Sequence, residues 1–377
     1  VRIRPGAVVR VFEYAPNQWR LTQLPEVQSA FVAIHPQTGA IQALVGGFDF
    51  TRNKFNHVTQ GWRQPGSSLK PFIISAALER GFGPATVIPD EPLFFGAAQT
   101  GSDAWEPKNY DGKFDGPLSL QEGLARSKNM VSIRVLNAIG PAYAQEWLTR
   151  FGFEAKRHPA YLTMALGAGA VTPLQMASAY GVFANGGHYI APMLITKITD
   201  NKGQVLRQFA PEQTSEDNRV IPARNAFVMN TMLNEITRSG TAARAQATLK
   251  RPDLFGKTGT TNKAFDAWFL GFQPDLVAAV WVGYDQPRNL GSRETGGGLS
   301  LPIWLDYMSA VLPRYAVRSY SPPEGVAHNG PFWGYTDEAS GPGIARLNDA
   351  ALPAGAAAIP PLAPQDRKEI LDMFKGE

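Results

Sequence analysis

Along this chain, segments in which apolar and polar residues alternate every two positions flank long regions with a helical period. Alternation is typical of half-buried strands, and turn residues between two alternating runs indicate a hairpin. The predicted strands are residues 8–14, 19–24, 29–34, 40–45, 195–200, 205–209, 254–257, 264–272 and 276–282. Because the last three follow one another directly, we expect them to form an antiparallel sheet.

In the other regions apolar residues recur every three or four positions, which predicts helices. One helix is predicted from Ser67 to Arg80, with Pro71 tolerated in its first turn and Gly81 as a candidate C-cap. The other predicted helices are 118–125, 129–139, 143–151, 173–184 and 225–237. Together with the sheet, they predict a mixed α/β (α+β) fold.

The pattern changes near both ends and divides the chain into three predicted parts. Residues 1–26 are a linker or the remnant of an upstream domain, and residues 27–320 are the main domain. Residues 321–377 are a C-terminal tail, because the Ala/Pro-rich stretch 350–364 interrupts regular structure. A short amphipathic helix is expected at 365–375.

The composition narrows the chemistry available to this fold. The 377 residues include no cysteine, which excludes thiol catalysis, disulfide scaffolds, zinc-finger-type sites and cysteine-ligated iron–sulfur clusters. The 5 histidines lie far apart and form no H-E-x-x-H pair, so we expect no metal and no cofactor. A net charge of +4 from scattered side chains is too weak a field to predict nucleic-acid binding.

The two ends of the sequence also lack the marks of a whole membrane protein. No stretch approaches the roughly 20 apolar residues that a membrane-spanning helix needs. The chain begins with Val1-Arg2-Ile3, which is neither a start methionine nor a signal peptide. We therefore expect the chain to be a piece of a longer protein.

Three short motifs carry the candidate chemistry. Ser67-Ser68-Leu69-Lys70 is a Ser-x-x-Lys pattern at a predicted helix start, Ser127-Lys128-Asn129 is a Ser-x-Asn pattern, and Lys257-Thr258-Gly259-Thr260 continues a predicted strand. The first two patterns arise readily by chance, whereas Lys-Thr-Gly is rare at this composition. All three in this order, each in its matching structural context, strongly indicate one active site.

These residue types suit acyl transfer through a serine. Residues spaced i, i+3 share one helix face, so the Lys70 amine can reach the Ser67 hydroxyl and take its proton. A lysine serves as this base only if burial or a second cation lowers its pKa, and Lys257 is the candidate second cation. The helix N-terminus also offers Ser67 a positive dipole end. Ser127 can relay a proton to a leaving amine, and Asn129 can hydrogen-bond a substrate amide.

The Lys-Thr-Gly strand is predicted to bind the substrate. On a sheet edge its main chain can pair with an extended peptide, and Gly259 has no side chain to block that approach. The hydroxyls of Thr258 and Thr260, with the Lys257 charge, suit a substrate carboxylate. The backbone N–H groups of Ser67 and Thr260 would form the oxyanion hole.

With their surroundings, the motifs resemble the transpeptidase domain of the class A, bifunctional penicillin-binding proteins of the 1A type. The resemblance covers roughly residues 27–320. It includes Phe31-Val32-Ala33-Ile34, Ala43-Leu44-Val45-Gly46-Gly47, Gln64-Pro65-Gly66-Ser67, Ser127-Lys128-Asn129-Met130-Val131, Phe183-Ala184-Asn185-Gly186-Gly187, residues 256–262 and Asp266-Ala267-Trp268-Phe269. It implies the fold of DD-transpeptidases and serine β-lactamases, an antiparallel sheet flanked by helices plus a helical subdomain that carries Ser127.

The same resemblance implies a reaction and a place in the cell. Ser67 would attack the penultimate D-Ala carbonyl of a stem peptide ending in D-Ala-D-Ala, and the amine of a neighbouring stem peptide would accept the acyl group. β-Lactam antibiotics would mimic the substrate and acylate the same serine. Family members carry an upstream glycosyltransferase domain and a membrane anchor, and nothing here resembles either. The chain is therefore expected to be the extracytoplasmic (periplasmic) part of an anchored protein, with cell-wall synthesis partners.

Several alternatives stay open from the residues alone. A D,D-carboxypeptidase would differ only in its acceptor, and a non-catalytic penicillin-binding sensor would be acylated without crosslinking. A class A β-lactamase is disfavoured, because residues 162–187 contain no carboxylate to activate water. Nucleotide binding is disfavoured, because Arg251 stands where a phosphate-binding loop needs glycine. Trp105 is either a wall of the active-site cleft or a packed surface aromatic.

Overall fold

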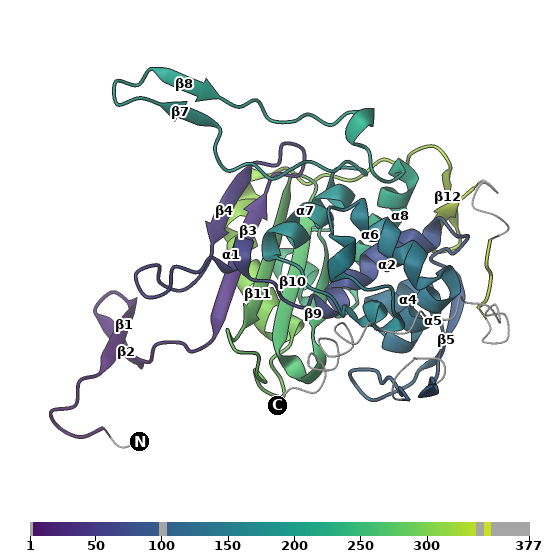
Figure 1. Ribbon diagram of the computed structural model, residues 1–377, viewed down its shortest axis with the longest axis horizontal. Coiled ribbons are helices and arrows are strands. Elements are labelled where there is room, and N and C mark those ends of the chain that lie inside the picture. The colour runs from purple at the N-terminus through teal and green to yellow at the C-terminus, as the bar shows by residue number, and fades with distance from the viewer. Residues whose placement is uncertain (1–2, 98–103, 337–342, 348–377) are drawn as a thin grey trace.

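The computed structural model describes residues 3–97, 104–336 and 343–347. A central sheet, a group of helices packed beside it and several two-stranded sheets make up this part of the chain (Figure 1). The stretch 350–364 and the helix expected at 365–375 lie outside the described residues.

The central sheet is antiparallel throughout. Its five strands are, in spatial order, β4 (Ile41–Val45), β3 (Gln28–Ile34), β11 (Leu276–Gly283), β10 (Asp266–Gln273) and β9 (Phe255–Thr260). Every position of β10 and β11 is buried, so other elements cover both faces of the sheet's centre. The strand β9 forms one edge, as the sequence analysis predicted for the Lys-Thr-Gly strand.

Helices cover the sheet on both faces. Side chains at odd and even positions of a strand point to opposite faces. On β3, Phe31 packs on α10 (Leu301–Val311), whereas Ile34 lies beside α7 (Pro173–Ala184). The α7 helix contacts β3, β10 and β11. The sheet is therefore the middle layer of the fold.

A second group of helices surrounds α2 (Lys70–Leu78), which is buried at every position. A helix buried on all sides needs partners on all sides. Those partners include α5 (Asn129–Ile139), α6 (Pro141–Thr149) and α8 (Ala223–Arg238). The rings that pack around Phe72 of α2 are Phe151, Phe153, Tyr180 and Phe183, with centroids 4.8, 5.1, 5.2 and 5.3 Å away.

The predicted helices are present, although several begin at other residues than expected: α6 and α8 begin two residues earlier, and α2 and α4 begin later. The segment from Gly66 to Leu69 is a 3₁₀ helix, η1, that precedes α2. The helix expected from Leu118 is α4 (Leu120–Ala125), because Ser119 and Glu122 form a capping box that starts it there. The remaining short helices are α1 (His57–Gln60), η2 (Ala155–Arg157), η3 (Leu162–Leu166), η4 (Glu216–Asn218), α9 (Arg244–Leu249), η5 (Asn262–Ala264), η6 (Gly296–Ser300) and η7 (Leu312–Arg314).

Two predicted hairpins lie apart from the central sheet (Figure 1). They are β1 (Arg10–Ala15) with β2 (Gln18–Thr22), and β7 (Lys197–Thr199) with β8 (Val205–Gln208). Other elements have no counterpart in the sequence prediction, among them α1, α9, α10 and two strand pairs. These pairs are β5 (Val87–Asp90) with β6 (Gly116–Ser119), and β12 (Val326–Asn329) with β13 (Phe332–Tyr335).

The β12–β13 hairpin belongs to the segment that the sequence analysis described as a tail. It packs on the helices, because Trp333 meets Phe227 of α8 edge-on with centroids 5.0 Å apart. The Tyr335 hydroxyl donates to Glu79, at the end of α2, at 2.6 Å. Packing on the main domain thus continues beyond residue 320, and the division into three domains stays a prediction. Within the described ranges, no helix combines the length and apolar character needed to cross a membrane.

Candidate active site

The three motifs meet in one cleft of about 630 Å³. The Ser-x-x-Lys motif comes from η1 and α2, the Ser-x-Asn motif from the segment between α4 and α5, and the Lys-Thr-Gly motif from β9. The predicted site residues that line the cleft are Ser67, Trp105, Ser127, Asn129, Thr258 and Thr260. The cleft therefore lies between the edge of the sheet and the helices.

Ser67 is presented to the cleft by the start of η1. Gly66 has a φ of 54°, and a Cβ there would lie 2.7 Å from the carbonyl oxygen of Thr260. Only glycine lets η1 approach β9 so closely. Ser67 is partly exposed, and its hydroxyl makes no hydrogen bond to any described residue.

Lys70, the first residue of α2, is fully buried. Its Nζ donates to Ser127 O at 2.7 Å and to Asn129 Oδ1 at 2.8 Å, and it lies 3.4 Å from Ser127 Oγ. Both residues belong to the described part of the chain, and the expected hydrogen bond between Lys70 and Ser67 is absent there. Burial, followed by the nearby Lys257 charge, lowers the pKa of Lys70 well below its usual value, against a smaller opposing effect of Asp90.

Ser127 lies between the two buried lysines. Lys257 Nζ donates to Ser127 Oγ at 2.8 Å and to Thr258 O at 3.0 Å. Burial lowers the pKa of Lys257 to about 7. One hydroxyl is thus in reach of two amines that both release their protons more easily than a lysine in water. This arrangement can pass a proton along the cleft floor.

The free edge of β9 faces the cleft with unused backbone groups. The N–H of Thr261 donates to Asp266 O of β10 at 3.1 Å. Hydrogen bonding alternates along an antiparallel strand, so the N–H groups of Thr260 and Thr258 point away from β10. The N–H of Thr260 is therefore free to donate towards the cleft beside Ser67, as the oxyanion-hole prediction requires.

Gly259 is needed for a reason that the sequence analysis did not give. A Cβ at this position would lie 2.6 Å from Pro65 O and 3.0 Å from Ser68 Oγ. The missing side chain thus lets the segment before α2 pack on β9. Its role in substrate binding stays a prediction.

Trp105 satisfies both of the alternatives raised for it. It lines the cleft. It also pairs with Phe95 through two backbone hydrogen bonds of 2.9 and 2.8 Å, and the two rings stack with centroids 5.5 Å apart. Phe95 therefore fixes the orientation of the indole in the cleft wall.

Sequence reasoning missed Thr241 and Asn109, which also line the cleft. The hydroxyls of Thr241 and Thr258 lie 2.8 Å apart. Asn109 accepts the N–H of Asn129 at 2.7 Å. Both residues lie in loops that have no periodic pattern, so no signal in the sequence could have found them. In the described ranges, no group of three or more His, Asp and Glu side chains could hold a metal ion.

A nucleophile at a helix start, opposite a free sheet edge and backed by buried lysines, defines the class of active-site serine enzymes to which DD-transpeptidases and serine β-lactamases belong. Comparison with known protein families shows where in this class the chain belongs. The family described as "Penicillin binding protein transpeptidase domain" matches residues 29–309. The chain belongs to this family, which confirms the prediction made from the motifs.

Individual relatives agree with the family. Penicillin-binding protein 1A of Neisseria lactamica is 43% identical over 354 residues, which are 93% of this chain and 44% of that protein. The crystal structure of penicillin-binding protein 1A from Haemophilus influenzae has a TM-score of 0.81 and 37% identity, covering 85% of this chain and 52% of that one. PonA1 from Mycobacterium tuberculosis, solved with penicillin V, has a TM-score of 0.65 and 26% identity, covering 83% and 84%. The chain spans less than half the length of the curated relative.

Proposed function

We propose that this chain is a serine D,D-transpeptidase that crosslinks peptidoglycan stem peptides and is inhibited by β-lactams. The observation that carries the proposal is the contact of Ser127 with two buried lysines beside Ser67. Burial lowers the pKa of both lysines, that of Lys257 to about 7, which suits proton transfer by Lys257 near neutral pH. The penicillin complex of PonA1 supports acylation by β-lactams.

In the proposed first step, Ser67 Oγ attacks the carbonyl of the penultimate D-Ala. Neutral Lys70 takes the hydroxyl proton as the C–O bond forms. The N–H groups of Ser67 and Thr260 stabilise the negative charge on the carbonyl oxygen. The C–N bond then breaks, and Ser127 passes a proton to the amine of the leaving D-Ala. Lys257 returns a proton to Ser127, and the proton that Lys70 took from Ser67 then passes through Ser127 to Lys257, so both lysines regain their starting protonation states.

In the second step, the amine of a neighbouring stem peptide attacks the ester on Ser67. The new amide forms, the ester bond breaks, and the proton of the amine returns to Ser67 through the same groups. Asn129 binds a substrate amide during both steps. The hydroxyls of Thr258 and Thr260 bind the terminal carboxylate, and we add Thr241 to this set because it contacts Thr258.

The relatives also support a proposal about the setting of the whole protein. We propose an extracytoplasmic location at the periplasmic face of the membrane, where the substrate occurs. The chain spans 44% of its Neisseria lactamica relative. A membrane anchor and a glycosyltransferase domain are accordingly proposed for the remainder of the full-length protein.

Acylation tests the nucleophile. We expect one covalent adduct per chain with a fluorescent penicillin, observed by intact-mass spectrometry, and no adduct for Ser67→Ala, because the ester oxygen is removed. Ser68→Ala is the matched control, since this neighbouring hydroxyl donates to Pro65 O and is buried. It should keep the adduct. An adduct that survives Ser67→Ala would refute the assignment.

The products separate the alternatives. Incubation with uncrosslinked glycan strands should yield crosslinked peptides together with free D-Ala. Free D-Ala without crosslinks would indicate a D,D-carboxypeptidase, and acylation without either product would indicate a sensor. Rapid loss of the penicillin adduct would indicate a β-lactamase.

A further inference from the structure

Ser127 has a backbone conformation that few L-residues adopt, with a φ of 58°. The N–H of Ser127 donates to Leu124 O at 3.0 Å, and the N–H of Lys128 donates to Gly123 O at 2.8 Å. These two bonds form the Schellman arrangement at the end of α4, in which the left-handed position is usually glycine. A serine there carries strain of about 1–2 kcal/mol, so its surroundings must hold it in place.

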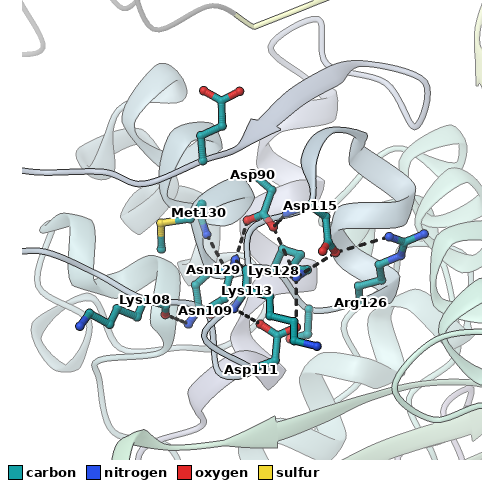
Figure 2. Close-up of polar contacts among 12 residues, drawn as sticks. Asp90, Lys108, Asn109, Asp111, Lys113, Asp115, Arg126, Lys128, Asn129 and Met130 are labelled. Atoms are coloured by element: carbon teal, nitrogen blue, oxygen red, sulfur yellow. Dashed lines mark hydrogen bonds and ion pairs between the residues drawn. The ribbon is translucent and has the colours of Figure 1, made fainter.

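The next residue, Lys128, ends among three carboxylates (Figure 2). Its Nζ lies 2.9 Å from Asp115 Oδ2, 3.1 Å from Asp111 Oδ2 and 3.4 Å from Asp90 Oδ2. We call Asp90, Asp111 and Asp115 the acidic cluster. The Lys128 side chain is 4% exposed and that of Asp90 is 0% exposed, so water screens this pair little.

Lys128 stays charged in this environment. Burial alone would lower its pKa, but hydrogen bonds to Asp115 and Asp111 outweigh burial and raise the pKa. In return, Lys128 lowers the pKa of Asp115. Arg126 also pairs with Asp115, at 3.4 Å, so removing Lys128 would leave mainly the fully buried Asp90 without its cationic partner.

Asn109 connects the acidic cluster to the start of α5. Its Nδ2 donates to Asp90 Oδ1 at 2.7 Å, and its Oδ1 accepts the N–H of Asn129 at 2.7 Å. Lys128, the N-cap residue of α5, makes no side-chain cap bond of its own. Asn109 thus replaces the missing cap and fixes Asn129, which receives a hydrogen bond from Lys70.

The acidic cluster also acts on Lys70 through charge. Asp90 of β5 raises the pKa of Lys70, whereas Lys257 of β9 lowers it further after burial. Lys128 is paired with the same Asp90 carboxylate. Its positive charge therefore reduces the amount by which Asp90 raises the pKa of Lys70.

We propose that Lys128 is a positioning residue for the proton relay. By pairing with the acidic cluster, it holds Ser127 in the left-handed conformation in which the serine bridges Lys70 and Lys257. The inference deepens the proposed function and rests on it. The middle position of the Ser-x-Asn motif is then a support for the two residues that flank it.

The test compares acylation by a fluorescent penicillin across pH. For Lys128→Met we expect the second-order rate constant to fall about tenfold or more, because the relay loses its geometry. The acidic limb of the pH profile should also move to higher pH, because unpaired Asp90 favours protonated Lys70. Lys128→Arg should recover most of the rate and restore the limb, since it keeps the charge.

Lys113→Met is the matched control. It removes the same charge from the loop that carries Asp111 and Asp115, but the Lys113 side chain is exposed and forms no ion pair with a described residue. We expect the wild-type rate and pH profile. A control that behaves like Lys128→Met would overturn the proposal.

The other outcomes are equally decisive. A wild-type chain that is not acylated at Ser67 refutes the proposed function. If the wild type is acylated, a folded Lys128→Met variant with the wild-type rate overturns the inference, and so does a slower variant whose acidic limb has not moved.

If circular dichroism shows that Lys128→Met is unfolded, Lys128→Gln replaces it in the test. This variant keeps hydrogen bonding and must show the same shift of the acidic limb. If neither variant folds, Lys128 serves the fold itself and the positioning role is wrong.

Discussion

Two lysine amines of the site lie in the interior of the protein, where a charge is unfavourable. The pKa of Lys257 falls to about 7, and that of Lys70 falls well below 10.5. In the unfolded chain both regain the ordinary value of 10.5. Between these values the unfolded chain binds more protons than the folded chain, so the free energy of unfolding rises with pH from about 7 to about 10.5.

We expect Lys257→Met to flatten this rise, because the variant no longer has a buried amine that must lose its proton. Urea unfolding from about pH 6 to about pH 10 measures the effect. Acylation should fall about a hundredfold or more, since the proton relay is cut. Lys202→Met, at an exposed turn, should alter neither property. An undiminished pH slope in Lys257→Met would show that folding does not lower the pKa of Lys257.

At the scale of elements, the site depends on how closely η1 approaches β9. Two glycines permit this approach, Gly66 from the side of η1 and Gly259 from the side of β9. At each of these two positions, a side chain would collide with the backbone of the opposite segment. The distance between the nucleophile and the free N–H of Thr260 is therefore set by backbone packing.

Gly66→Ala tests this dependence. Its Cβ would meet Thr260 O at 2.7 Å, so η1 must shift, and we expect acylation to fall about tenfold or more. Gly203→Ala is the control, because Gly203 also has a positive φ, of 83°, but nothing lies within 4 Å of the added Cβ. The control should lose stability through backbone strain, about 1 kcal/mol, and keep its acylation rate. Equal rate losses in both variants would assign the effect to strain.

At the scale of the whole molecule, the β12–β13 hairpin contacts the end of α2, the helix that carries Lys70. Glu79, just after α2, accepts hydrogen bonds from Tyr335 at 2.6 Å and from Asn225 at 2.8 Å. Burial, and then the charge of Glu79, raises the pKa of Tyr335, so the phenol stays protonated as a donor. Segments more than 250 positions apart are thus joined at one carboxylate.

Tyr335→Phe should destabilise the protein by about 1.5–3 kcal/mol, the usual range for a hydrogen bond to a charged group. Thermal and urea unfolding measure the change. Acylation at Ser67 should stay close to wild type, because the bond lies at the far end of α2. Tyr315→Phe is the control, since its hydroxyl has no hydrogen bond to a described residue. A Tyr335→Phe variant of full stability would show that the hairpin contributes nothing through this bond.

The sequence predicted those parts whose pattern is local. The strands β9, β10 and β11 and the helices α5 and α7 follow from their own periodicity. The motifs identified Ser67, Lys70, Ser127 and Lys257, which the structure brings together.

What stayed hidden depends on distant partners. The four-residue strands β5, β6, β12 and β13 are too short to show a period. Asn109, Thr241 and the ion pairs of Lys128 act at the site only because loops from different parts of the chain meet there. Lys70 also donates to Ser127 and Asn129, which come from a distant segment of the chain that the helical spacing rule cannot reveal.

The left-handed backbone of Ser127 brings selection for stability into conflict with selection for activity. Glycine would relax the turn after α4, so any search for thermostable variants is drawn towards glycine at this position. The same exchange would delete the hydroxyl that Lys257 contacts. Stabilising this domain by consensus or by directed evolution thus requires an activity screen, because the most favourable residue for the turn is one that cannot carry a proton.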